Sequence, residues 1–195
     1  MKKLMLLVTA LAACAALAIP ATASAWTMEG LELTETGNVQ GEGSASFTGG
    51  TVCSNGAMAH MTLQASGMGA SVTEFGVTSP EANCEVTETL RSLGCTKLTS
   101  TESLNLPWSA QENTVTKKIE VTGNVKIVNH YAGGGLCPGT VTLTHEPGEE
   151  ILLTPDNVNE AHELTLSGTI HTSLGTKSTI GGVIRATENS GTYGI

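Results

Sequence analysis

Five histidines are the residues of this sequence best suited to acid–base or metal chemistry, because imidazole exchanges protons and binds metal ions near neutral pH. They are His60, His130, His145, His162 and His171. No His-x-His or His-Glu-x-x-His arrangement, which would place two imidazoles together, occurs among them. We therefore predict neither a metal site nor a cofactor, and we interpret each histidine as a surface or hydrogen-bonded residue.

Nucleophilic catalysis would need a serine or cysteine beside a histidine that a carboxylate orients. Serines are frequent, but no Gly-x-Ser-x-Gly motif occurs, and Asp156 is the sole aspartate. Hydrolysis of a sugar bond needs two carboxylates that face the same sugar. Glu149 and Glu150 are adjacent, and adjacent residues of a strand point to opposite faces, so they do not suit this reaction. We expect both to be solvated loop charges. No catalytic residue is predicted. A hydrolase whose His, Glu and Ser side chains meet only in the fold is the alternative.

The densest group of oxygen ligands spans residues 154–163, with the sequence Thr-Pro-Asp-Asn-Val-Asn-Glu-Ala-His-Glu. Calcium prefers such carboxylates and amides, but the spacing departs from the known calcium loop, and no glycine supplies its sharp turn. A Pro-Asp-Asn sequence opens turns by itself. We predict a turn with a short helical stretch over 156–163, and calcium binding is the alternative.

Aromatic platforms for sugar binding are scarce, because the chain has only two residues each of Trp, Tyr and Phe. Trp108 falls at an apolar position of an alternating segment, which predicts a place in the core. Tyr131, in the sequence Asn129-His130-Tyr131, is expected in a loop. It is the best remaining candidate for a residue that contacts a ligand.

The N-terminal residues 1–25 have the three parts of a secretory signal peptide. Two lysines precede an apolar run, a proline and a group of small residues: Lys2, Lys3, 4–19, Pro20 and 21–25. We predict export with cleavage after Ala25. A lipoprotein cleaved at Cys14 is the alternative, because Leu-Ala-Ala-Cys at 11–14 resembles a lipobox. A membrane anchor is disfavoured, since the apolar run is short for a bilayer.

The exported product, residues 26–195, is expected to be one acidic domain, and a chain of this length suits a single core. Cleavage removes two lysines and no acidic residue, which leaves seven basic against eighteen acidic residues and a net charge of −11. A chain of this charge lacks the positive surface that would attract nucleic acid or anionic lipid, and nucleic acid is excluded as a partner. No second apolar run is long enough to form a transmembrane anchor in the mature chain.

Four cysteines remain after cleavage, and an even number in an exported chain indicates two disulfides. They are Cys53, Cys84, Cys95 and Cys137. Of the three possible pairings we favour Cys84–Cys95, which closes a short loop, together with Cys53–Cys137. A four-cysteine metal site is the competing interpretation, but no Cys-x-x-Cys pair supports it.

Apolar residues recur at every second position in segment after segment, which predicts β-strands with one buried face. The buried sets are expected at Ala57, Ala59, Met61, Leu63 and Ala65, at Leu104, Leu106, Trp108 and Ala110, and at Val115, Ile119, Val121, Val125 and Ile127. Pro107 implies an edge or a bulge, and Gly123 divides the third segment.

Further strands are expected at 44–48, 71–77, 96–100, 140–145, 163–172 and 179–187, the last two forming a hairpin that turns near Leu174-Gly175. Residues 26–43 have few apolar residues to bury, and a loose leading strand is the most that we expect there. Many short antiparallel strands predict an all-β fold, either a β-sandwich or a barrel-like variant, tied by the disulfides.

The chain resembles uncharacterised secreted proteins of actinobacteria. The features that carry the resemblance are the four cysteines, Leu106-Pro107-Trp108, Cys137-Pro138 and the closing Gly-Thr-Tyr-Gly-Ile at 191–195. It implies export and a disulfide-tied β fold, and it assigns no activity to any residue. Because the sequence predicts a disulfide-tied β scaffold with variable loops and no assembled catalytic set, we expect a non-catalytic module outside the cell or at its envelope, whose partner is an extracellular or envelope ligand. The secreted hydrolase is the alternative.

Overall fold

The computed structural model describes residues 27–28, 31–32, 37–64, 69–113, 116, 118–156, 163–188 and 193–194. The predicted signal peptide, the lipobox at Cys14, Val115, His162 and the turn at 157–162 lie outside the described residues. Within the described ranges, no helix has the length and apolar character needed to cross a membrane.

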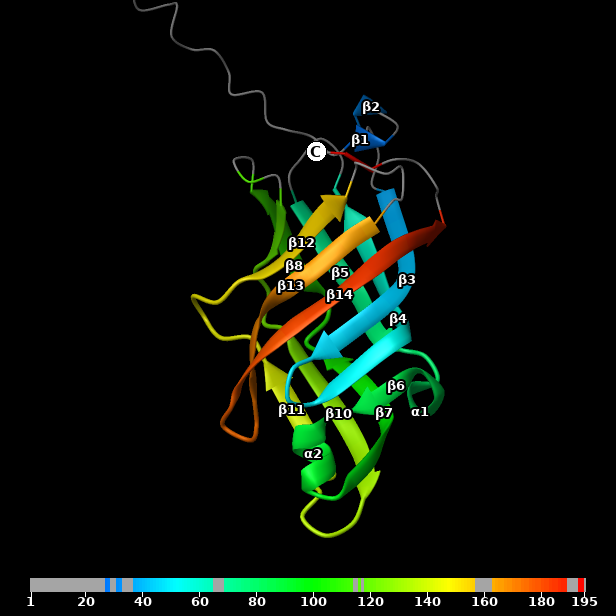
Figure 1. The fold of residues 1–195 in the computed structure, drawn as a ribbon. Helices are drawn as coiled ribbons and strands as arrows, with labels where there is room; N and C mark the ends of the chain where they lie inside the picture. Colours follow the sequence, from blue (N-terminus) through cyan, green and yellow to red (C-terminus); the bar gives the residue numbers. More distant parts are fainter. Residues whose placement is uncertain are drawn as a thin grey trace, which may run out of the picture.

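The predicted all-β, barrel-like fold is confirmed: eight antiparallel strands close into a barrel (Figure 1). In the order in which they pair, they are β12 (Ile151–Asp156), β9 (Lys118–Val121), β8 (Trp108–Asn113), β5 (Gly69–Val77), β4 (Thr51–Leu63), β3 (Gly37–Phe47), β14 (Lys177–Glu188) and β13 (Glu163–Thr172). Pairing of β12 with β13 closes the ring. Closure leaves no exposed edge in this ring, which removes the usual site of edge-to-edge association.

Two barrel strands change partner along their length and so carry a second group of strands below the ring (Figure 1). The far end of β13 pairs with β11 (Thr140–Thr144), which continues through β10 (Lys126–Gly133) to β7 (Cys95–Leu104). The start of β4 pairs with β6 (Cys84–Val86). Two short helices, α1 (Pro80–Asn83) and α2 (Glu88–Ser92), flank β6, and β1 (Thr27–Met28), β2 (Leu31–Glu32) and β15 (Tyr193–Gly194) form a separate small sheet.

Alternating burial along the strands follows the predicted parity. Ala57, Met61 and Leu63 of β4 are buried, and Ala59 packs against the same core. In the third predicted segment Ile119, Val121, Val125 and Ile127 are all buried. Gly123 lies between β9 and β10, where a Cβ would stand 2.7 Å from the Ser109 nitrogen, so this turn requires glycine.

The interior consists of two apolar clusters. The first lies within the closed barrel and continues beneath β10 and β11, and it includes Phe47, Phe75, Trp108, Ile127, Leu143 and Ile170. The second lies with the lower strands and includes Val86, Leu90, Leu98, Tyr131 and Val141 together with Cys53, Cys84 and Cys95. Both disulfides therefore belong to the second cluster.

One part of the predicted strand map was wrong. Leu104 was expected to be buried on one strand with Trp108, but it ends β7 and is 38% exposed, whereas Trp108 begins β8 and is buried as predicted. Asn105, with φ of 63°, redirects the chain between them. Residues 37–43, in the segment where a loose leading strand was expected, form the first part of β3 and pair with both β4 and β14.

The four cysteines form two disulfides as predicted, but the favoured pairing was wrong. The bonds are Cys53–Cys84, with Cα atoms 3.9 Å apart, and Cys95–Cys137, with Cα atoms 4.9 Å apart. The register of β4 with β6 places Cys53 directly opposite Cys84. Cross-strand register thus decides the pairing, and the short sequence distance between Cys84 and Cys95 does not.

Candidate functional site

The strands β7, β10 and β11 present a polar outer face at the lower end of the molecule. Residues that pair directly across antiparallel strands point to the same side, so the register builds three rows of outward side chains. The rows are Ser100–His130–Thr140, Glu102–Val128–Thr142 and Leu104–Lys126–Thr144. We call these nine residues the His130 face. The alternate residues Ile127, Asn129 and Tyr131 are buried beneath it.

The centre of chemical interest on the His130 face is the imidazole itself. Thr140 Oγ1 lies 3.3 Å from His130 Nδ1, and Glu102 Oε1 lies 3.7 Å from His130 Nε2. A hydroxyl, an imidazole and a carboxylate in this order are the parts of a nucleophilic triad. No sequence motif marks this group, because its members come from three different strands.

Exposure limits what this group does. The His130 and Glu102 side chains are 37% and 61% exposed, and Thr140 is exposed as well. Solvent screens the attraction between exposed charges, and a contact of 3.7 Å exceeds a hydrogen bond. The arrangement is therefore suited to hydrogen bonding with a ligand more than to activation of a hydroxyl.

A second charged cluster joins the β13–β14 hairpin to the connection between β11 and β12. His171 and Lys177 pair across the hairpin, and His171 Nε2 and Lys177 Nζ each lie 2.9 Å from Glu149 Oε1. The hydrogen bond from Lys177 lowers the pKa of Glu149, with a further contribution from His171, while desolvation of the carboxylate acts in the opposite direction. Glu149 was expected to be a solvated loop charge, and this was wrong: its side chain is only 11% exposed.

Two other histidines are also held by neighbouring groups. His145 Nε2 lies 2.7 Å from the carbonyl oxygen of Glu149, and its Nδ1 lies 3.4 Å from that of Gly123. His60 Nδ1 lies 2.8 Å from Glu74 Oε2 on the outer face of the barrel. In the described part of the chain, no group of three or more His, Cys, Asp or Glu side chains is arranged to hold a metal ion.

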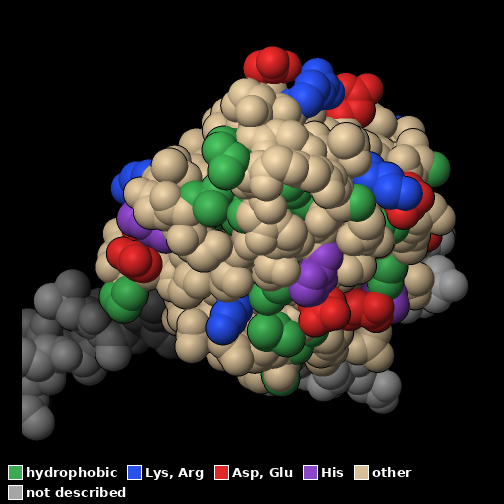
Figure 2. Space-filling view, turned by 90° about the horizontal axis from the view of Figure 1, so that it is seen from below, with side chains coloured by type: hydrophobic (Ala, Val, Ile, Leu, Met, Phe, Trp, Pro, Cys, Tyr) green, Lys and Arg blue, Asp and Glu red, His purple; other side chains and the backbone are tan. Residues whose placement is uncertain are grey.

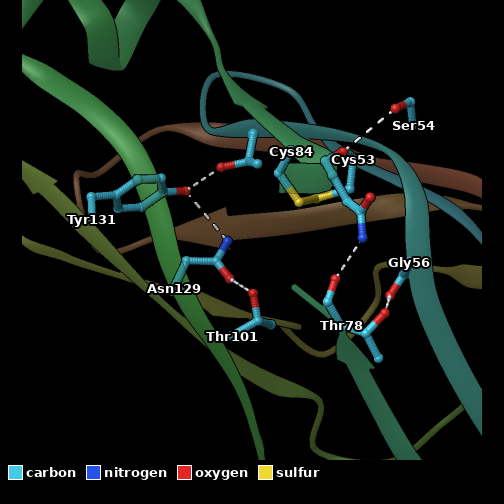
Figure 3. The surroundings of a disulfide bond; sticks show 10 residues. Cys53, Ser54, Gly56, Thr78, Cys84, Thr101, Asn129 and Tyr131 are labelled. Atoms are coloured by element: carbon cyan, nitrogen blue, oxygen red, sulfur yellow. Dashed lines mark hydrogen bonds between the residues drawn. A yellow bond between two sulfur atoms is a disulfide. The ribbon is translucent and has the colours of Figure 1, made fainter. Parts of the chain in front are cut away.

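Tyr131 was expected to contact a ligand from a loop, and the structure contradicts this. It belongs to β10 and is only 6% exposed. Its hydroxyl oxygen lies 2.7 Å from Thr51 Oγ1, and the Asn129 amide donates to it at 3.4 Å (Figure 3). Thr101 in turn donates to the Asn129 side-chain oxygen at 2.9 Å. Burial raises the pKa of Tyr131, although its hydrogen bonds with Thr51 and Asn129 act to lower it.

The surface of the lower end is mixed in character. Figure 2, which views the molecule from below, shows basic side chains close to acidic ones within a broad uncharged surface. Two ion pairs in this part of the fold are Lys97 of β7 with Glu81 of α1, at 2.8 Å, and Arg91 with Glu88, both of α2, at 3.4 Å. These charges are therefore paired locally.

Part of the second charged cluster, the pair His171 and Lys177, could have been predicted from the sequence. A hairpin that turns near Leu174-Gly175 places His171 close to Lys177, so that pair could have been predicted. Glu149, in contrast, reaches them through a separate connection.

The chain matches no protein-family model, no curated protein and no solved structure.

Proposed function

We propose that this protein is a non-catalytic module of the cell exterior that binds a component of the cell envelope through the His130 face. Export is supported by the signal-peptide pattern of residues 1–25 and by two disulfides, which form in oxidising compartments. The resemblance to secreted actinobacterial proteins supports the same location.

The observation that carries this proposal is the combination of a polar outer face with a filled interior beneath it. Hydroxyl groups of Thr140, Thr142 and Thr144 stand beside His130 and Lys126 at positions fixed by strand register. The buried side chains of Ile127, Val141 and Leu143 support these strands from inside. A binding surface on rigid strands loses little conformational entropy when it binds.

A secreted hydrolase is the second candidate, and the contact of 3.3 Å between Thr140 and His130 favours it. Electrostatic catalysis is strong where water is excluded and where donors are already aimed at the developing charge. The exposure of His130, Glu102 and Thr140 opposes that requirement. A binding surface needs these three groups only to be accessible for hydrogen bonds, so their exposure favours binding over catalysis.

Sedimentation with an insoluble actinobacterial cell-wall preparation tests the proposal. The mature, oxidised protein should sediment with the wall material, and His130→Ala should weaken this binding about fivefold to tenfold, the effect of roughly one lost hydrogen bond. His60→Ala is the matched control, because His60 is also a half-exposed histidine paired with a glutamate on an outer face. No sedimentation of the wild type, or equal loss in both variants, would contradict the proposed surface.

A further inference from the structure

Strand β4 carries a bulge where it changes partner from β6 to β5. Between Cys53 and Ala57 it advances by four residues while β3 advances by two. Ser54, Asn55 and Gly56 therefore have no opposite residue in the pairing of β4 with β3, β5 or β6. Asn55 is exposed, and no described residue forms a hydrogen bond with its side-chain amide. This amide is consequently free to turn toward the next peptide bond.

Packing requires glycine at position 56. The φ angle of Gly56 is +75°, and a Cβ there would stand 2.5 Å from Asn83 Nδ2 and 2.7 Å from the carbonyl oxygen of Thr78. Thr78 also donates its backbone N–H and its hydroxyl to the Gly56 carbonyl oxygen, at 2.7 and 3.2 Å, next to the Cys53–Cys84 disulfide (Figure 3). The fold therefore keeps an Asn-Gly pair at an exposed bulge.

We propose that Asn55 is a site of spontaneous deamidation in the folded protein. The backbone nitrogen of Gly56 loses its proton to solvent and attacks Cγ of Asn55, a new C–N bond forms, and the side-chain nitrogen takes up a proton and leaves as ammonia. Water then opens the resulting cyclic imide at either carbonyl, which gives aspartate or isoaspartate. No atom is oxidised or reduced.

The residue that follows each asparagine distinguishes Asn55 from comparable positions. Glycine has no Cβ to obstruct the approach of its nitrogen, and Asn55 is the sole asparagine of the sequence followed by glycine. Asn124 is also exposed, but it precedes the β-branched Val125. Two exposed asparagines of the same chain thus differ in the steric demand of the neighbour.

The product would alter the bulge chemically and geometrically. Both products add one negative charge to an already acidic protein. Isoaspartate also routes the main chain through the former side-chain carbon, which lengthens it immediately before the Gly56 carbonyl that Thr78 holds. We expect this form to loosen the junction between β4 and β5.

Peptide mapping by mass spectrometry tests the proposal on the folded, oxidised protein during incubation at mildly alkaline pH. We expect loss of the original Asn55 peptide, with the mass gain of –OH in place of –NH2, while the Asn124 peptide is retained. Asn55→Gln should remove the acidic species seen by isoelectric focusing, since the longer side chain cyclises less readily, and Asn124→Gln should not. The proposal fails if Asn55 converts no faster than Asn124, or if acidic species persist in Asn55→Gln.

Discussion

Thr51 Oγ1 in β4 lies 2.7 Å from the hydroxyl oxygen of Tyr131 in β10, and both side chains are buried although eighty residues separate them. This contact connects a strand of the closed barrel to the lower strands. Asn129 completes the group by donating to the same hydroxyl oxygen. A buried polar group stabilises a fold only when its partners are present.

Tyr131→Phe should therefore lower the free energy of unfolding by about 1–3 kcal/mol, because Thr51 and Asn129 each lose a buried partner. Urea denaturation followed by circular dichroism measures this change. In the double variant Thr51→Val with Tyr131→Phe, the loss should be smaller than the sum of the two single losses. A Tyr131→Phe protein as stable as the wild type would show that the contact contributes nothing.

The burial of Tyr131 could have been predicted from the alternation of buried and exposed positions along its strand. Ile127, Asn129 and Tyr131 share one parity, and all three are buried. Asn129, in the middle of this run, is buried because its amide group bonds with Thr101 and Tyr131 inside the protein. The period-two pattern was the better guide.

Strand order and register could not be read from the sequence. The alternation at 57–63 predicted which residues of β4 are buried, but it contains no information about which strand lies beside Cys53. The pairing of β4 with β6 sets that disulfide. The proximity of Glu102, His130 and Thr140 likewise depends on the order β7–β10–β11, which is a tertiary property.

The two disulfides should stabilise the protein to a similar extent. Their sequence separations are 31 and 42 residues, and in the chain-entropy model loops of these lengths each contribute about 4 kcal/mol. We expect Cys53→Ala with Cys84→Ala, and Cys95→Ala with Cys137→Ala, to lower the melting temperature by about 10 °C each. Calorimetry of both double variants measures the effect. A loss confined to one pair would contradict the argument from loop length.

Stability at acid pH should depend on Glu149. Its pKa in the folded state is lowered, first by the hydrogen bond from Lys177, so the interaction stabilises the folded state above the ordinary glutamate pKa of 4.5 and is lost as the pH falls through the lowered value. Glu146, 3.7 Å from the shared His171, is the other carboxylate that faces this group.

Glu149→Gln should be less stable than the wild type at neutral pH, and the difference should shrink as the pH falls below about 4.5. Unfolding by urea at a series of pH values measures both effects. Glu150→Gln, in the same connection, is the control and should leave the slope of stability with pH unchanged. A pH-independent difference for Glu149→Gln would show that lost packing, and not the charge, is responsible.

Binding by the His130 face without chemical turnover can be measured in a single assay. Mature protein is incubated with the insoluble cell-wall preparation, and bound protein and newly soluble wall fragments are quantified in the same sample. We expect saturable binding that His130→Ala weakens, with no release of fragments above the protein-free control. Release of soluble fragments that is lost in both His130→Ala and Thr140→Ala would contradict the claim and establish the hydrolase instead.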